Sequence, residues 1–359
     1  MKKKKSKLII TLIVLIAFLA TYVIIGLLPR PQNYEGTNPM MKTGAMPMLI
    51  AHGGGHKEFP DNTLEAFYNA YSVDENVMME TDVSLTKDGV LILSHDITLD
   101  RKTNVTGLIS DWNYSDLISQ KVDFGYTNET YEDGEQVKLE EGSARIKFKS
   151  DLDSLKGKEV TPLDVEYPTG ISPTSMPAGV TQRDNDVFLA TTLEDLMLAF
   201  PNNKINVEIK QSGEQGKKAL QEAFRLLEKH DAYDRMVLAS FHDEIYDEFI
   251  AYQKSEGANP KFMYSPGTGG ATKFFIMQMV EVDVFFTDGI AVLQLPMEQI
   301  GFNLATTSLT DAAHNHNIAV HYWTIDDEKD MEYLIGIGAD GIMTNYPHKL
   351  KEVYENYGK

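Results

Sequence analysis

Short apolar segments recur along the chain between residues 48 and 345, and polar segments separate them. Their length and their enrichment in Val, Ile, Leu, Met and Phe are typical of buried β-strands. We interpret them as strands, and they cover residues 48–52, 77–85, 90–96, 204–210, 235–241, 261–265, 282–288, 318–325 and 340–345.

Helical periodicity fills several of the intervals between these strands. Leu64, Phe67 and Tyr71 are spaced three and four residues apart, which gives one face of a helix predicted to begin near Asn62. Similar apolar faces occur in the segments 193–200 and 220–227. The alternation of strands and helices indicates an α/β protein. About eight strands in one domain predict a TIM-type (β/α)8 barrel.

The segment from Glu80 to Asp96 departs from this alternation. Its central sequence TKDGV places an Asp-Gly pair between two apolar segments. Such a pair is typical of the turn of an antiparallel hairpin, whereas a parallel connection needs a longer crossover. We therefore expect the barrel to be irregular near the second and third strands.

Two further segments lack any periodicity. Residues 31–47 are rich in Pro, Gly, Asn and Thr and are predicted to be a linker. A polar segment at about 126–187 contains acidic pairs at 132–133 and 140–141 and many turn residues. It indicates an inserted subdomain or long loops over one mouth of the barrel, or else a partly disordered segment. The predicted barrel thus covers residues 48–350, with an insertion at about 126–187.

The first 30 residues differ from the rest of the chain. Five lysines at positions 2–5 and 7 precede an uncharged apolar segment, residues 8–28. A helix of this length spans about 30 Å, the thickness of the hydrocarbon core of a bilayer. We favour an uncleaved transmembrane anchor over a cleaved signal peptide, because the segment is long and lacks a clear cleavage pattern. The lysines predict a cytoplasmic N-terminus and an extracellular barrel at the cell membrane.

The charge and the composition limit the possible partners and chemistry. Beyond residue 30 the chain has 27 basic and 53 acidic residues, a formal net charge of −26. This excess of acid argues against binding of nucleic acid. The chain has no cysteine, so disulfides, thiol catalysis and thiolate metal sites are excluded.

Candidate catalytic residues lie at the ends of four predicted strands, where barrel enzymes collect their chemistry. His52 and His95 end the first and third strands, and imidazoles transfer protons near neutral pH. Residues two apart in a strand point to the same face. Glu80 therefore shares a face with Asp82, and Glu208 shares one with Lys210, either inside the barrel or outside it. Buried carboxylates need a cation or hydrogen-bond donors, and carboxylate oxygens are the ligands of hard cations.

These residues belong to a series of motifs that resembles one enzyme family. The order and spacing of eight motifs are similar to those of glycerophosphodiester phosphodiesterases, over residues 48–125 and 188–350. The motifs are HGG…FPDNTLEAF, ETDVSLTKDGVLILSHD, LDRKTNVTG, TTLEDLM, NVEIK, LASF, HYWTIDD and GADGIMTNYP. The resemblance implies a TIM barrel that hydrolyses glycerophosphodiesters to glycerol 3-phosphate and an alcohol, usually with a divalent cation.

The resemblance also implies roles for single residues. It assigns His52 and His95 to acid/base catalysis and Lys210, Trp323 and Asp61 to the substrate. The implied ligands of a Ca²⁺ or Mg²⁺ ion are Glu80, Asp82 and Glu208.

This chain departs from the family pattern in one loop. Gly53 stands where the family usually has a phosphate-binding arginine, and Asp61 stands where it has a glutamate. Alternatives to the diesterase are therefore a catalytically degenerate surface protein that binds polyol phosphates, and a related lysophospholipase D or phospholipase C-type enzyme.

Overall fold

The computed structural model of the chain describes residues 2–126, 176–255 and 262–359. Eight parallel strands form a barrel in the order β6-β5-β4-β2-β1-β11-β10-β7. A backbone hydrogen bond of 3.3 Å from Ala291 N to Tyr264 O joins the two edges, so the barrel is nearly closed. The strands are β1 (Met48–His52), β2 (Met78–Leu85), β4 (Ile205–Ile209), β5 (Met236–Ala239), β6 (Met263–Ser265), β7 (Val292–Leu295), β10 (Ala319–Tyr322) and β11 (Gly341–Thr344).

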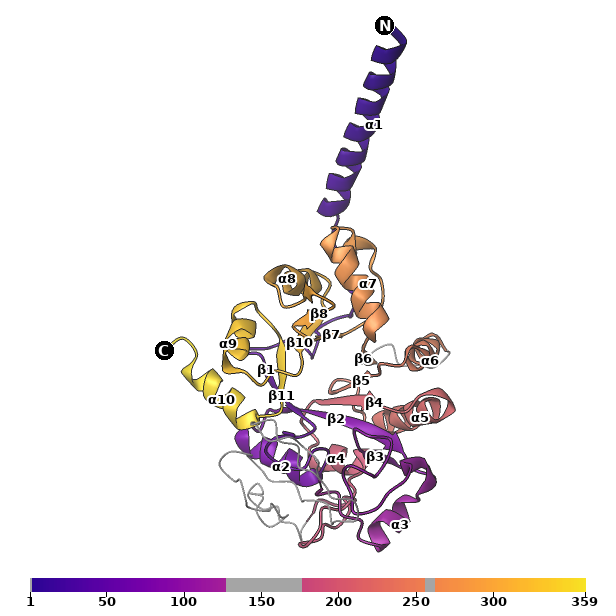
Figure 1. Ribbon diagram of the computed structural model, residues 1–359, viewed down its shortest axis with the longest axis vertical. Helices are drawn as coiled ribbons and strands as arrows, with labels where there is room; N and C mark the ends of the chain where they lie inside the picture. The colour runs from indigo at the N-terminus through magenta and orange to yellow at the C-terminus, as the bar shows by residue number, and fades with distance from the viewer. Residues whose placement is uncertain (1, 127–175, 256–261) are drawn as a thin grey trace.

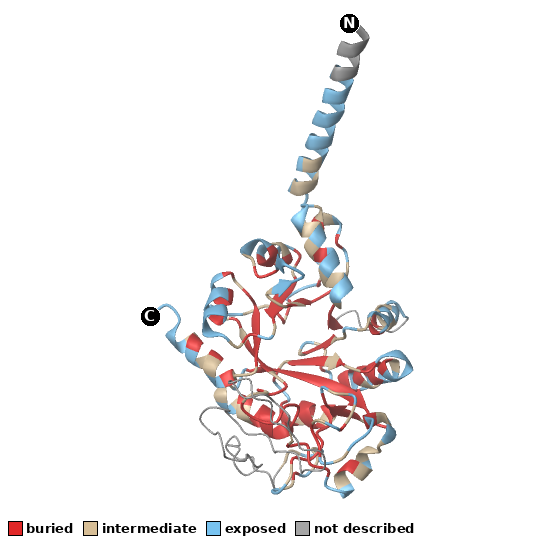
Figure 2. Cartoon of the chain, in the orientation of Figure 1, coloured by how far each residue is buried: buried red, intermediate tan, exposed pale blue. Residues whose placement is uncertain are grey.

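Helices surround these strands and cover their outer faces (Figure 1). Figure 2 shows that the strands are buried, whereas outer helices such as α5, α6 and α9 keep an exposed side. This arrangement confirms the TIM-type barrel predicted from the sequence. The helices are α2 (Leu64–Val73), α3 (Tyr114–Ser119), α4 (Leu193–Ala199), α5 (Gly213–Lys229), α6 (Asp243–Lys254), α7 (Thr268–Met279), α8 (Thr307–Asn315), α9 (Glu328–Gly336) and α10 (Pro347–Asn356), with a short 3-10 helix, η1 (Ile109–Asp111).

The predicted hairpin lies next to the second barrel strand. β3 (Leu91–Leu93) pairs antiparallel with β2, and Val83 lies opposite Leu93 in the register. The barrel is therefore irregular where the Asp-Gly turn indicated that it would be.

One predicted strand is wrong. The apolar segment 282–288 forms a 3-10 helix, η3 (Asp283–Phe285), and the seventh barrel strand lies further on, at β7. The Asp283 carboxylate accepts hydrogen bonds from Arg30 and contacts His316 Nε2 at 3.1 Å. These polar contacts hold the segment outside the barrel, where Phe285 stays exposed.

The predicted linker, residues 31–47, contains no helix or strand and packs against the barrel. Tyr34 and Met40 are buried beside inward-facing strand residues such as Ile50 and Met78. His321 Nε2 lies 2.9 Å from the carbonyl oxygen of Met40. The segment therefore fills the end of the barrel from which the parallel strands start.

A long helix, α1 (Lys2–Leu27), projects from the barrel beside α7 (Figure 1). Its residues Ile9–Leu27 are apolar and exposed, and they are long enough to cross a membrane. At its base, the Tyr22 hydroxyl donates a hydrogen bond to Val280 O, and Arg30 forms an ion pair with Asp283.

The end of the insertion is tied to α2. Residues 127–175 lie outside the described part of the chain, so the structure describes only the last residues of the predicted insertion. Among these, Arg183 is fully buried and forms two hydrogen bonds with the Glu65 carboxylate, at 2.9 and 3.0 Å. Arg183 also donates to the backbone carbonyl of Leu189.

Candidate active site

The polar residues of the barrel strands face its interior. Asp82 of β2 lies opposite Glu208 of β4 in the parallel register. Both line a cavity of about 270 Å³ at the carboxyl ends of the strands. This cavity also contains the side chains of five other predicted site residues: His52, Glu80, His95, Lys210 and Trp323. The sequence left open whether these carboxylates face the inside or the outside of the barrel. The structure shows that they face the inside.

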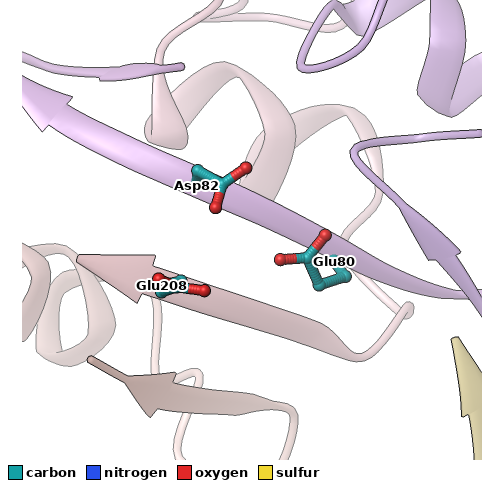
Figure 3. A group of neighbouring side chains, drawn as sticks. All are labelled: Glu80, Asp82 and Glu208. Carbon is teal, nitrogen blue, oxygen red and sulfur yellow. The ribbon is translucent and has the colours of Figure 1, made fainter. Parts of the chain in front are cut away.

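Three carboxylates form the floor of this cavity. Oxygen atoms from Glu80, Asp82 and Glu208 all lie within 4.8 Å of one another (Figure 3). Burial and the charge of Asp82 raise the pKa of Glu80 to about 8, and the same two causes raise the pKa of Glu208. The cluster is therefore electrostatically strained when its carboxylates are ionised.

The residues of the cluster fit a hard divalent cation. Ligands of Ca²⁺ lie about 2.3–2.6 Å from the ion, so opposed ligand oxygens can be about 5 Å apart. The carboxylates meet this separation. The buried side-chain oxygen of Asn206, which lines the same cavity, has no hydrogen-bond partner among the described residues. A bound cation would offset the negative charge of the three carboxylates and could also accept the Asn206 oxygen as a ligand.

Lys210 supplies a positive charge beside the cluster. Its Nζ donates a hydrogen bond of 2.8 Å to Glu208 and lies 3.4 Å from an oxygen of Asp82. Among the described residues that line the cavity, it is the only lysine or arginine. Lys210 is thus placed to meet the negative charge of a phosphate.

A chain of hydrogen bonds orients His52. Asp326 accepts a 2.7 Å hydrogen bond from the Asn345 side-chain amide, which turns the amide oxygen of Asn345 towards His52 Nδ1 at 2.7 Å. Nδ1 therefore carries the proton in this pair, and Nε2 faces Glu80 at 3.9 Å. Burial opposes the imidazolium, but Glu80 and Asp82 outweigh this effect and raise the pKa of His52.

His95 has its own carboxylate partner at the rim of the cavity. Its Nδ1 lies 2.8 Å from Asp96, and this hydrogen bond raises the pKa of His95. Asp96 also accepts a 2.7 Å hydrogen bond from Arg101. The pair is thus held in place by a third residue, an arrangement typical of a catalytic imidazole.

Asp61 lies behind the loop and does not line the cavity. Its buried carboxylate pairs with Lys102 at 2.8 Å and with Arg101 at 3.3 Å. These charges overcome the effect of burial and hold the pKa of Asp61 well below its usual range. The structure therefore brings seven of the eight predicted site residues together in the cavity, and it places the eighth, Asp61, where it supports the loop that carries Gly53.

Gly53 has a backbone conformation that favours glycine. Its φ is +55°, and a Cβ there would lie 3.1 Å from the Cβ of Asp61. Its backbone N–H donates a 2.9 Å hydrogen bond to Glu80. In this chain the position consequently contributes a backbone donor to the site, where the sequence comparison expects an arginine side chain.

Comparison with known proteins identifies the family. Residues 52–349 match the sequence profile of the Glycerophosphoryl diester phosphodiesterase family. The chain belongs to this family. It is therefore an enzyme of the phosphoric diester hydrolase class, and the resemblance seen in the motifs is confirmed.

Relatives of this phosphodiesterase include glycerophosphodiester phosphodiesterases and lysophospholipases D. The glycerophosphodiester phosphodiesterase of Bacillus subtilis is 25% identical and covers 86% of this chain and 87% of its own length. The human lysophospholipase D GDPD3 is 22% identical and covers 86% of both chains.

Solved structures of similar proteins share the fold. A phosphodiesterase of Oleispira antarctica, in complex with the product sn-glycerol-3-phosphate, superposes with a TM-score of 0.55 at 18% identity, over 87% of this chain and 98% of its own. A glycerophosphodiester phosphodiesterase of Agrobacterium tumefaciens has a TM-score of 0.55 at 15% identity, over 85% and 100%.

The sequence interpretation missed the residues that support this phosphodiesterase site. Asn62, expected near the start of a helix, has a φ of +57° and donates a 3.1 Å hydrogen bond to Asp82. The helix α2 begins two residues later, and Thr63 is its N-cap. Asn345 follows the last strand in sequence, and this position at a strand end was the available signal for it.

Proposed function

We propose that this phosphodiesterase hydrolyses glycerophosphodiesters to glycerol 3-phosphate and an alcohol. The observation that carries the proposal is the convergence of two histidines, three carboxylates and one lysine on a single cavity. The proposed cofactor is a divalent cation, Ca²⁺ or Mg²⁺, held by Glu80, Asp82 and Glu208. When bound, it would supply positive charge that offsets the charge of the phosphodiester.

His52 and His95 are proposed as the acid/base pair. One imidazole accepts the proton of the attacking hydroxyl group, and the other donates a proton to the oxygen of the departing alcohol. Over the complete reaction one water molecule is consumed, the bond from phosphorus to the alcohol oxygen breaks, and phosphorus gains an oxygen. The hydrogen bonds to Asn345 and Asp96 hold the two rings so that their Nε2 atoms can carry out these transfers.

Lys210 and Trp323 are proposed to bind the substrate. Lys210 projects from the strand end beside the carboxylates, where it can hold a phosphate oxygen. Trp323 lines the mouth and lies 5.8 Å from Phe241, measured between ring centroids. Asp61 is proposed to act indirectly, because its ion pairs with Lys102 and Arg101 fix the loop that carries Gly53.

The N-terminal helix is proposed to anchor the enzyme in the cell membrane. Ile9–Leu27 is long and apolar enough to span a bilayer. The five lysines before it favour a cytoplasmic N-terminus, which places the barrel outside the cell.

A product assay tests the proposed reaction. The full chain, reconstituted in lipid vesicles, is given glycerophosphocholine, glycerophosphoethanolamine and glycerophosphoglycerol, and glycerol 3-phosphate is measured. We expect release with Ca²⁺, Mg²⁺ or Mn²⁺ and none with a chelator. His95→Ala should lower kcat by about 10²–10⁴-fold, since it removes a proton-transferring group.

His348 offers a matched control for His95. Its side chain is 60% exposed and its Nδ1 lies 2.7 Å from Glu58, compared with 50% and 2.8 Å from Asp96 for His95. His348 does not line the cavity, so His348→Ala should keep full activity. Metal-dependent binding of the diesters without any product would favour a degenerate binding protein and overturn the proposal.

A further inference from the structure

A second hollow adjoins the catalytic cavity. It has a volume of about 410 Å³ and lies between α7 and the hairpin β8 (Glu298–Gln299)–β9 (Phe302–Asn303). We call it the α7 groove. It shares four lining residues with the catalytic cavity: Phe241, Pro266, Gln294 and Trp323. The two hollows therefore lie side by side at the Trp323 ring.

The lining of the α7 groove is apolar, and much of it is exposed to solvent. Large apolar side chains on both walls are accessible, among them Ile276 and Met279 of α7 and Ile300 and Phe302 of the hairpin. Clustered exposed apolar side chains of this kind mark a surface that binds an apolar partner. Two other hollows among the described residues are smaller, at about 240 and 10 Å³.

The groove runs towards the proposed membrane anchor. Met279 lies at the end of α7 where the Tyr22 hydroxyl of α1 bonds to Val280 O. Figure 1 shows α1 leaving the barrel at this end of α7. One end of the groove is thus at the base of the membrane helix, and the other end is at the catalytic cavity.

We propose that the α7 groove binds the acyl chain of a lysophospholipid whose glycerophosphate group occupies the catalytic cavity. The inference rests on the proposed function and narrows its substrate class. One continuous groove accommodates one chain, which suits a monoacyl lipid. The reaction consumes one water molecule, whose oxygen becomes bonded to phosphorus. The bond between phosphorus and the headgroup oxygen breaks, that oxygen receives a proton, and the products are lysophosphatidic acid and the free alcohol.

The charge of the protein favours a zwitterionic headgroup. Beyond residue 30 the chain has a formal net charge of −26, which repels anionic headgroups. Lysophosphatidylcholine is therefore the probe of choice, and glycerophosphocholine is the matching compound without an acyl chain.

The test compares choline release from these two compounds by the full chain in phosphatidylglycerol vesicles with divalent cation. We expect kcat/KM to be at least about tenfold higher for palmitoyl-lysophosphatidylcholine, because the buried methylene groups add binding energy. Ile276→Asp places a charge in the groove and should remove most of this preference, while turnover of glycerophosphocholine stays unchanged.

Val280→Asp is the matched control. Val280 follows α7 and is 43% exposed, compared with 49% for Ile276, but it does not line the groove. This variant should keep the preference for the acylated substrate. Ala271→Trp, which fills the groove from the first turn of α7, should act as Ile276→Asp does.

Four outcomes overturn the inference while the proposed function stands. They are equal turnover of both compounds by the wild type, equal loss of both activities in Ile276→Asp, faster release from diacyl phosphatidylcholine, and a dimer that Ile276→Asp dissociates. The last would make the groove a contact between two copies of the chain.

If the wild type releases choline from neither compound and glycerol 3-phosphate from none of the three diesters, the proposed function fails and the groove is tested by binding. Saturable binding of lysophosphatidylcholine that Ile276→Asp weakens and Val280→Asp preserves would then support the acyl site. Absence of such binding would overturn it.

Discussion

Glu80 illustrates how a single residue links the site to the stability of the protein. Its raised pKa, about 8, means that the folded chain keeps a proton that the unfolded chain releases near the ordinary value of 4.5. Between these values the folded state binds more protons, so its stability falls as the pH rises. The loss of stability is complete above about pH 8, where Glu80 is ionised. A bound cation would therefore stabilise the folded chain most at this pH.

We predict that thermal melting in chelator shows this dependence. The melting temperature of the wild type should fall between about pH 5.5 and 8.5, and Glu80→Gln should reduce the fall because the neutral amide cannot ionise. Added Ca²⁺ or Mg²⁺ should raise the wild-type melting temperature more at the higher pH than at the lower. Glu80→Gln should show little cation effect and little activity.

An exposed glutamate serves as the control for this experiment. Glu332 lies on the outer side of α9, and Glu332→Gln should melt with the pH dependence of the wild type. If Glu80→Gln kept that same dependence, the ionisation of Glu80 would not be its cause.

The sequence predicted the ionisable residues that line the cavity better than the residues that hydrogen-bond to them. Strand periodicity was sufficient to place Glu80 beside Asp82, since alternate residues share a face. It could not predict that Asn345 contacts His52, because they lie 293 positions apart in the chain and only the pairing of β1 with β11 brings them together. Asn62 was missed because its left-handed backbone conformation depends on its tertiary contacts with β2.

At the scale of elements, the buried ion pair between Arg183 and Glu65 connects the end of the insertion to α2. Both side chains are fully buried, so neither charge has water as an alternative partner. Removal of one member leaves the other unpaired in a site of low polarity. The pair thus makes the position of α2, and of the site loop before it, depend on the insertion.

We predict that Arg183→Met lowers the free energy of unfolding by about 3–5 kcal/mol, because Glu65 is left uncompensated. The double variant with Glu65→Leu should recover much of this loss. Urea titration followed by circular dichroism measures both effects.

Arg225 provides the comparison at the surface. It makes two hydrogen bonds to Glu222 on α5, but its side chain is largely exposed. Arg225→Met should cost less than about 1 kcal/mol. Equal losses at the two positions would contradict a special role of the buried pair.

The missed strand has a physical explanation at this scale. The segment 282–288 contains two valines and two phenylalanines, whereas β7, VLQL, is only four residues long and has no aromatic residue. Local pattern therefore favoured the wrong segment. Gln294 of β7 faces the catalytic cavity, and a functional polar position of this kind weakens the apolar signal of a strand.

At the scale of the whole molecule, α1 is the proposed membrane anchor of the enzyme. We predict that the chain remains in the membrane fraction after alkaline washing and keeps its N-terminal residues. Protease added outside intact cells should digest the barrel, since the basic flank favours retention of the N-terminus in the cytoplasm. Immunoblots against tags at the two ends measure both properties.

The alternative of a cleaved signal peptide gives a different result. The barrel would then appear as a soluble, shortened chain whose first residue lies near the end of α1. N-terminal sequencing of the mature protein distinguishes the two outcomes, which the apolar length of the helix alone does not.

The connection between α1 and the barrel is short and held by hydrogen bonds. Two residues separate Leu27, the end of α1, from Arg30, which bonds to Asp283 through two nitrogen atoms and to the carbonyl oxygens of Gly26 and Leu28. With α1 in a bilayer, the α7 groove would sample only the lipids of its own leaflet. The rate would then depend on the surface density of the substrate in that leaflet. Added inert lipid lowers this density, so it should slow turnover even when the total amount of substrate is constant.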